Sequence, residues 1–226
     1  MAKNKLRRFA DNATMDCVFQ PNLETALANS FPLKGKWHAD YFKNDNPIIV
    51  ELGCGKGEYA VGLGKMYPNR NYIGVDIKGA RIWEGANEVR ELGLKNIGFV
   101  RARIDFVHTF FGENEIDEIW LTFSDPQPNK ANKRLSSKIF IDRYRQFLKQ
   151  GGLIHLKTDS DVLFESTLEQ IEEHGYSMLE HTWDLYGEMP EDLDQSTREI
   201  LSIRTHYETI FSAKGFKIKY CKFRIT

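Results

Sequence analysis

The chain has 226 residues, of which 41% are hydrophobic and 28% are charged, which is typical of a globular domain with a full core and excludes a disordered chain. Its formal net charge of −1 excludes a strongly basic protein, so any nucleic-acid binding would depend on local clusters of positive charge. It has no run of about 18 apolar residues and no apolar core of a signal peptide, so we expect a cytoplasmic location and no membrane partner.

The first forty or so residues show no clear hydrophobic period and open with basic side chains. We therefore expect residues 1–42 to form a partly mobile basic arm and packing segment. Aromatic side chains such as Trp37 would pack this segment onto the main domain, residues 43–226.

From Pro47 onward, short apolar runs alternate with helical stretches, which is typical of a parallel sheet covered by helices on both faces. Strands are predicted over residues 48–52, 71–76, 97–101, 116–123 and 152–158. Ser136 is expected to cap a helix that continues to Leu148 and ends at Gly151. In the C-terminal part of the sequence, the pattern predicts a strand within residues 176–186, a helix around 197–213 and a final strand over 216–224.

Positive charges are segregated along the chain although the total is balanced. They gather in residues 3–8, 130–149 and 214–224, whereas residues 161–199 are mostly acidic. Because salt limits electrostatic effects to about 10 Å, such clusters can still form a local phosphate-binding surface. Ordinary solvated helix faces are an equally good interpretation of the same charges.

A glycine-rich turn follows the first strand of the main domain. Glu51 stands near the end of that strand, Gly53, Gly55 and Gly57 follow, and Asp76 ends the next strand. A doubly wound sheet binds its ligand at this place, outside the carboxyl ends of the strands. Glycines let the loop turn sharply and approach a ligand closely, and a carboxylate after the second strand can accept hydrogen bonds from both hydroxyls of a ribose.

The glycine spacing distinguishes two classes of cofactor. Dinucleotide sites favour GxGxxG with a helix N-terminus aimed at a pyrophosphate, whereas this chain has GxGxG preceded by Glu51. A carboxylate beside the loop attracts the sulfonium and ammonium groups of S-adenosylmethionine and repels a pyrophosphate. The pattern therefore favours S-adenosylmethionine, with a purely structural turn as the alternative.

A second candidate site lies at the end of the strand predicted over residues 116–123. Asp125 follows that strand, and Pro126 and Pro128 stiffen the loop. Asp159 follows the next strand and would lie beside the same cleft. A transferable methyl group would point here, although a plain Asp-Pro turn is the alternative.

The ordered series ELGCGKG, GVDIK, FSDPQP, HLKTD and residues 205–208 resembles the bacterial tRNA (guanine-N7-)-methyltransferase family, from about Leu6 to Gly215. The resemblance implies an α/β, Rossmann-like class I S-adenosylmethionine-dependent methyltransferase fold. Its mostly parallel, seven-stranded sheet would have helices on both faces. It also implies transfer of a methyl group from S-adenosylmethionine to N7 of a guanine in the variable loop of tRNA (position 46), forming 7-methylguanosine.

The resemblance assigns roles to individual residues. Asp125 would be catalytic or would orient the guanine. The cofactor-binding residues would be Glu51, Gly53, Gly55, Gly57, Asp76, Arg103, Ile104 and Asp125. The residues facing tRNA would be Asn129, Lys130, Asp159, Thr205, Tyr207 and Glu208.

Three departures from the family pattern accompany these residues. Gln127 replaces a tryptophan, the segment 129–131 replaces Lys-Arg-His, and Arg103-Ile104 replaces Asp-Ala. Two alternatives therefore stay open: a methyltransferase acting on another RNA base or a small molecule, and an RNA-binding scaffold of the same fold with weak catalysis.

No metal is expected. The three cysteines are widely spaced without a CxxC pair, and the six histidines lack ligand spacing. The partner implied by the resemblance is tRNA, and the chain would act as a monomer or a homodimer.

Overall fold

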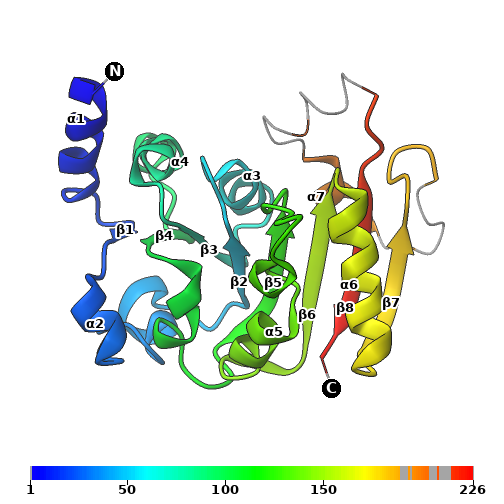
Figure 1. Ribbon diagram of the computed structural model, residues 1–226. Coiled ribbons are helices and arrows are strands. Elements are labelled where there is room, and N and C mark those ends of the chain that lie inside the picture. The colour runs from blue at the N-terminus through cyan, green and yellow to red at the C-terminus, as the bar shows by residue number, and fades with distance from the viewer. Residues whose placement is uncertain (1, 189–192, 194, 204–207, 209–214, 226) are drawn as a thin grey trace.

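A computed structural model of the chain describes residues 2–188, 193, 195–203, 208 and 215–225. Within these residues, eight strands form one sheet in the order β1-β4-β3-β2-β5-β6-β8-β7 (Figure 1). The strands are β1 (Val18–Phe19), β2 (Ile48–Leu52), β3 (Asn71–Asp76), β4 (Ile97–Arg101), β5 (Ile116–Thr122), β6 (Leu148–Thr158), β7 (Ser177–Thr182) and β8 (Lys219–Arg224).

Helices cover both faces of this sheet. The α-helices are α1 (Ala2–Asn12), α2 (Leu23–Leu27), α3 (Glu58–Met66), α4 (Gly79–Leu92), α5 (Lys138–Tyr144), α6 (Asp161–Glu173) and α7 (Gln195–Ser202). A π-helical segment, η1 (Trp37–Phe42), and two 3₁₀ segments, η2 (Ile104–Thr109) and η3 (Ala131–Lys133), complete the described elements.

Strand direction determines where a ligand can bind. Strands β1 to β6 run parallel to their neighbours, and only β8 is antiparallel, between β6 and β7. From β2 the chain builds outward to β3 and β4 on one side, then to β5 and β6 on the other. The loop that follows β2 therefore lies at the switch point of strand order, where open parallel sheets bind their ligands.

The core has two layers because strand side chains alternate between the faces. Ile48, Val50 and Leu52 of β2 pack with the aromatic side chains of η1, η2, α5 and α6, including Trp37. Ile49 points the other way and packs with α3, α4 and α7. The alternation confirms that β2 is covered on both faces, as its uninterrupted apolar run predicts.

The five central strands are confirmed where the sequence predicts them, but the helix after β5 is shorter than expected. It ends at Tyr144, and Leu148 already begins β6, where it pairs with Ile116. Ser136 is not its cap: Ser137 occupies that position, and the Ser136 hydroxyl hydrogen-bonds with Thr167 at 2.6 Å.

The N-terminal segment has more regular structure than its sequence predicts. β1 pairs with β4 and is the eighth strand, one more than expected. α1 packs on α4 largely through polar contacts: Asn12 donates to the Gly79 carbonyl at 2.8 Å, and the Arg8 guanidinium lies 4.6 Å from the Trp83 ring centroid.

Candidate active site

The glycine turn after β2 adopts a backbone that side chains disfavour. Gly53, Gly55 and Gly57 have φ angles of 85°, 56° and 74°. A Cβ added at Gly53 or Gly55 would meet nothing within 4 Å, whereas one at Gly57 would lie 2.5 Å from the Phe99 ring. The first two glycines therefore border open space, and the third allows close packing.

Asp76 at the end of β3 joins two loops. One carboxylate oxygen accepts from the Gly55 N–H at 3.0 Å, and the other accepts from the Lys78 N–H at 2.7 Å. These bonds hold the glycine turn against the start of α4. The carboxylate nevertheless lies on the wall of a cavity.

That cavity has a volume of about 1060 Å³ and opens at the carboxyl ends of the parallel strands. Its walls come from the segments that follow β2, β3, β4, β5 and β6. They comprise Gly53, Asp76, Ile77, Lys78, Arg81, Ala102, Arg103, Ile104, Asp105, Phe123, Ser124, Asp125, Pro126, Leu135, Phe140, Asp159 and Ser160. Ligand cavities are usually about 300–1,000 Å³, so this one has room for two reactants.

The loop that carries Asp125 is held in an unusual shape. Phe123 and Gln127, on either side of it, have positive φ angles of 48° and 44°. The Gln127 N–H donates to Asp125 at 3.0 Å, and Arg134 donates to the Pro126 carbonyl at 3.0 Å. Such backbone strain is common where a site requires one particular geometry.

Comparison with known proteins agrees with this geometry. A family model described as "Putative methyltransferase" matches residues 45–221. A tRNA (guanine-N(7)-)-methyltransferase of Bacteroides fragilis is 51% identical over 223 residues, 99% of this chain and 86% of that relative. One of Christiangramia forsetii is 44% identical, over 99% of each chain. The chain belongs to the tRNA (guanine-N(7)-)-methyltransferase family.

Solved structures support the fold of this family member independently. The solved structure of the 16S rRNA methyltransferase KamB aligns with a TM-score of 0.62 at 11% identity, covering 85% of this chain and 94% of that one. At that identity the likeness shows the fold alone. The Rossmann-like class I methyltransferase fold expected from the sequence is thereby confirmed.

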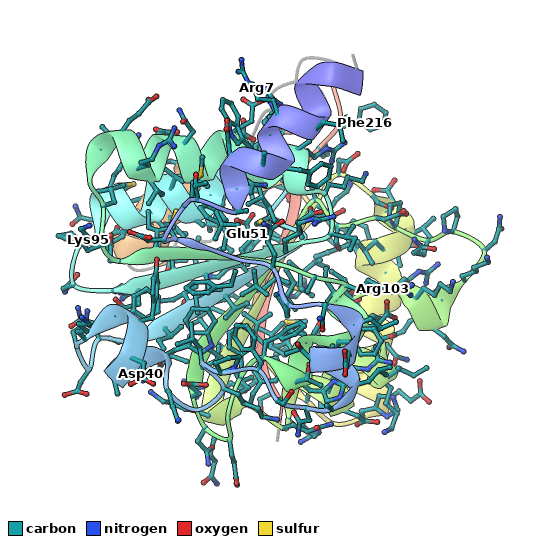
Figure 2. The ribbon with its side chains drawn as sticks, turned by 90° about the vertical axis from the view of Figure 1, so that its left-hand side faces the viewer. Arg7, Asp40, Glu51, Lys95, Arg103 and Phe216 are labelled. Carbon is teal, nitrogen blue, oxygen red and sulfur yellow. The ribbon has the colours of Figure 1, made fainter. Side chains whose placement is uncertain are left out.

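Glu51 is not among the described residues that line the cavity. Its side chain is buried near the centre of the molecule (Figure 2), accepts from the Ala60 N–H at 3.3 Å and also accepts from the Thr122 hydroxyl. Burial raises its pKa to about 8, so the group is mostly neutral at pH 7. The carboxylates of the cavity wall belong instead to Asp76, Asp105, Asp125 and Asp159, beside the basic residues Lys78, Arg81 and Arg103.

The position that departs from the family pattern, Arg103, lies at the rim of the cavity (Figure 2). Its side chain is 65% exposed and forms two hydrogen bonds to Asp105, at 3.0 and 3.2 Å. Asp105 thus supplies a carboxylate to the same wall, two residues beyond the position where the family usually has one. Ile104 lines the wall between them.

The residues expected to face tRNA do not all lie in one place. Asp159 lines the cavity, whereas Asn129 and Lys130 are exposed on the loop beyond Asp125 and outside the cavity wall. Thr205 and Tyr207 lie outside the described residues.

Glu208 is buried in this structure. Its side chain is fully buried and forms an ion pair with Lys157 at 2.9 Å. The role toward tRNA that the family resemblance implies for it stays a prediction. The sequence alone does not show that Lys157 would be buried beside it.

Sequence reasoning missed several residues of the cavity wall. Ile77 and Lys78 directly follow Asp76 and could have been found from the motif GVDIK, whereas Leu135 and Phe140 carry no local signal. Ser124 is adjacent to Asp125, and its buried hydroxyl has no hydrogen-bond partner among the described residues. A ligand in the cavity could supply that partner.

Two findings concern other classes of site. Among the residues that the structure describes, no cluster of histidine, cysteine and acidic side chains could hold a metal ion. None of the helices in the described part of the chain has the length and apolar character needed to cross a membrane.

Proposed function

We propose that this protein transfers a methyl group from S-adenosylmethionine to N7 of a guanine in tRNA, in the variable loop. One observation carries the proposal: a single cavity is bordered on one side by Gly53 and Asp76 and on the other by Asp125 and Asp159. The first side has the features of a nucleoside cofactor site, and the second offers acceptors to a base. The family to which the chain belongs favours tRNA as the source of that base.

The residues present fit S-adenosylmethionine. The wall carries four carboxylates beside three basic residues, Lys78, Arg81 and Arg103, and Arg103 pairs with Asp105. Asp76, Asp125 and Asp159 can face a cationic ligand, and apolar side chains such as Ile77 and Ile104 offer contact to a flat purine ring. The open space in front of Gly53 and Gly55 leaves room for a ligand close to the backbone. When bound, S-adenosylmethionine supplies an electrophilic methyl group attached to a positively charged sulfur.

Asp125 and Asp159 would orient the guanine. N7 has an in-plane lone pair and no proton to lose, so no general base is needed before methyl transfer. Either carboxylate can accept hydrogen bonds from guanine N1–H and the N2 amino group, and its charge balances the positive charge that develops on the purine. Catalysis then depends chiefly on positioning, to which the constrained Asp125 loop contributes.

The tRNA would be held through its phosphates. Lys130 and Lys133 are exposed on the loop between Pro126 and Leu135, two residues of the cavity wall. Lysine contacts to phosphate position a nucleic acid without reading its sequence. A guanine in a loop can reach the cavity more readily than a paired one can.

Methyl transfer to unmodified tRNA tests the proposal. The purified chain is incubated with an unmodified tRNA transcript and labelled S-adenosylmethionine, and the nucleosides are then identified. We expect 7-methylguanosine from the wild-type chain and at least a hundredfold less from Asp125→Ala, about the loss expected when positioning fails. Another methylated nucleoside would indicate a different target base. Binding of tRNA without any methyl transfer would indicate a scaffold.

A further inference from the structure

The C-terminal basic run contains a lysine that is not available to bind phosphate. Lys219 begins β8, and only 6% of its side chain is exposed. β8 pairs antiparallel with β6, and Lys219 lies opposite Thr158, the last residue of β6. Its ammonium group is therefore close to the turn that carries Asp159.

The ammonium group of Lys219 donates to two acceptors of that turn. It lies 2.9 Å from the backbone carbonyl oxygen of Asp159, and it forms an ion pair with Asp161, the first residue of α6. A buried ammonium group needs such partners because its desolvation is otherwise unfavourable. The two contacts join the end of β6 to the start of α6.

Other bonds fix the remainder of the turn without touching Asp159. The Ser160 N–H donates to the Thr158 hydroxyl at 3.1 Å, and the Ser160 hydroxyl accepts from the Leu163 N–H at 3.2 Å to cap α6. Asp159 lines the cavity, and the bond from Lys219 reaches its backbone carbonyl and not its carboxylate. Its direction therefore depends on how its own peptide is held.

We infer that Lys219 is a positioning residue for the methyl-transfer reaction and acts through Asp159. This inference rests on the proposed function, because it takes Asp159 to be the carboxylate that orients the guanine. Lys219 holds the Asp159 carbonyl, and the carbonyl sets the orientation of the carboxylate in the cavity. A misplacement of about 1 Å can lower a rate by up to about a hundredfold, so loss of this bond should reduce turnover.

The test compares two lysines of the same strand. Lys222 also belongs to β8 and is mostly buried, but it pairs with Glu180 of β7 and not with the turn at Asp159. We expect Lys219→Met to lower kcat/KM for tRNA by about tenfold or more while the Kd for S-adenosylmethionine changes less than twofold. Lys222→Met should leave kcat/KM within about twofold, since the Lys222 ammonium group pairs with Glu180 and not with the turn at Asp159.

A double-mutant cycle separates positioning from general destabilisation. In the Asp159→Asn background, Lys219→Met should lower kcat/KM by less than about twofold, because the group through which it acts is already impaired. Additive losses, or full activity of Lys219→Met alone, would overturn the inference. If Lys219→Met does not fold, Lys219→Gln, which keeps a polar group, replaces it in the same cycle with the same expected result.

The wild-type chain is assayed in the same experiment, and its product tests the proposed function. Absence of 7-methylguanosine from the wild-type chain would overturn the proposed function and this assignment with it. Normal wild-type product with unaffected Lys219 variants would overturn the assignment alone.

Discussion

The Gly55 N–H and the Asp76 carboxylate are joined by a hydrogen bond of 3.0 Å that connects the turn after β2 with the end of β3. This bond links the two segments that the sequence marks for the cofactor. The same carboxylate accepts from the Lys78 N–H, so one side chain organises two loops of the cavity wall.

Replacing Asp76 should weaken cofactor binding more than it weakens the fold. Asp76→Ala removes the acceptor of two backbone N–H groups and the expected acceptor for the ribose. Loss of such contacts is worth about 1–3 kcal/mol, which corresponds to roughly a tenfold to hundredfold higher Kd for S-adenosylmethionine. Isothermal titration measures this directly. An unchanged Kd would show that Asp76 does not contact the cofactor.

The glycines of the turn should differ in what they contribute. Gly57→Ala combines a left-handed backbone with a contact of 2.5 Å to Phe99, so we expect a loss of roughly 2–5 kcal/mol in the free energy of unfolding. Gly55→Ala meets no neighbour, and its loss should be limited to about 1–2 kcal/mol for the backbone alone. Chemical denaturation measures the free energy of unfolding of each variant and so ranks the two losses. The reverse order would contradict the packing described for Gly57.

Cofactor binding by the Gly55 variant provides a second measurement. Its new methyl group would occupy the open space beside the turn, so the Kd for S-adenosylmethionine should rise although the protein remains folded. Tight binding by Gly55→Ala would place the cofactor elsewhere in the cavity.

The buried Glu51 should make stability depend on pH. Its pKa is raised from 4.5 to about 8 by burial, so between these values the folded chain keeps a proton that the unfolded chain releases. Stability should therefore fall as pH rises from about 4.5 through about 8, with a slope of at most about 1.4 kcal/mol per pH unit from this group.

Glu51→Gln supplies the matched control, because glutamine keeps the shape and does not ionise. We expect the difference in unfolding free energy between this variant and the wild type to grow in favour of glutamine across that pH range. Denaturant titrations at pH 5, 7 and 9 provide the comparison. A difference that stays constant with pH would show that Glu51 is already charged in the folded chain.

Binding of tRNA should weaken steeply with salt. Lys130 and Lys133 are exposed on the loop between Pro126 and Leu135, and each phosphate contact contributes close to one unit to the slope of log K against log salt. Replacing each by alanine should reduce that slope by about one. Lys149 belongs to the same basic run but pairs with Asp117 at 2.6 Å, at the start of β6 and away from the cavity, so Lys149→Ala should leave the slope unchanged.

Local patterns in the sequence predicted much of the fold. The five central strands follow from apolar runs, since a strand buried on both faces needs such residues at every position. Two acids that follow strand ends, Asp76 and Asp125, both line the cavity because parallel strands bring their carboxyl ends to one edge of the sheet. The N-terminal elements were missed because α1 docks on α4 largely through polar contacts and β1 is only two residues long.

The residue sequence by itself determined the strand pattern, the glycine turn and the family to which the chain belongs, because these depend on neighbours along the chain. Only the tertiary structure decided which charges face the cavity. It buries Glu51, pairs Glu208 with Lys157, and brings Lys219 from the end of the chain to Asp159. Whether such a charged side chain is exposed or buried depends on contacts between segments that are far apart in the sequence. The spacing of residues along the chain does not predict those contacts.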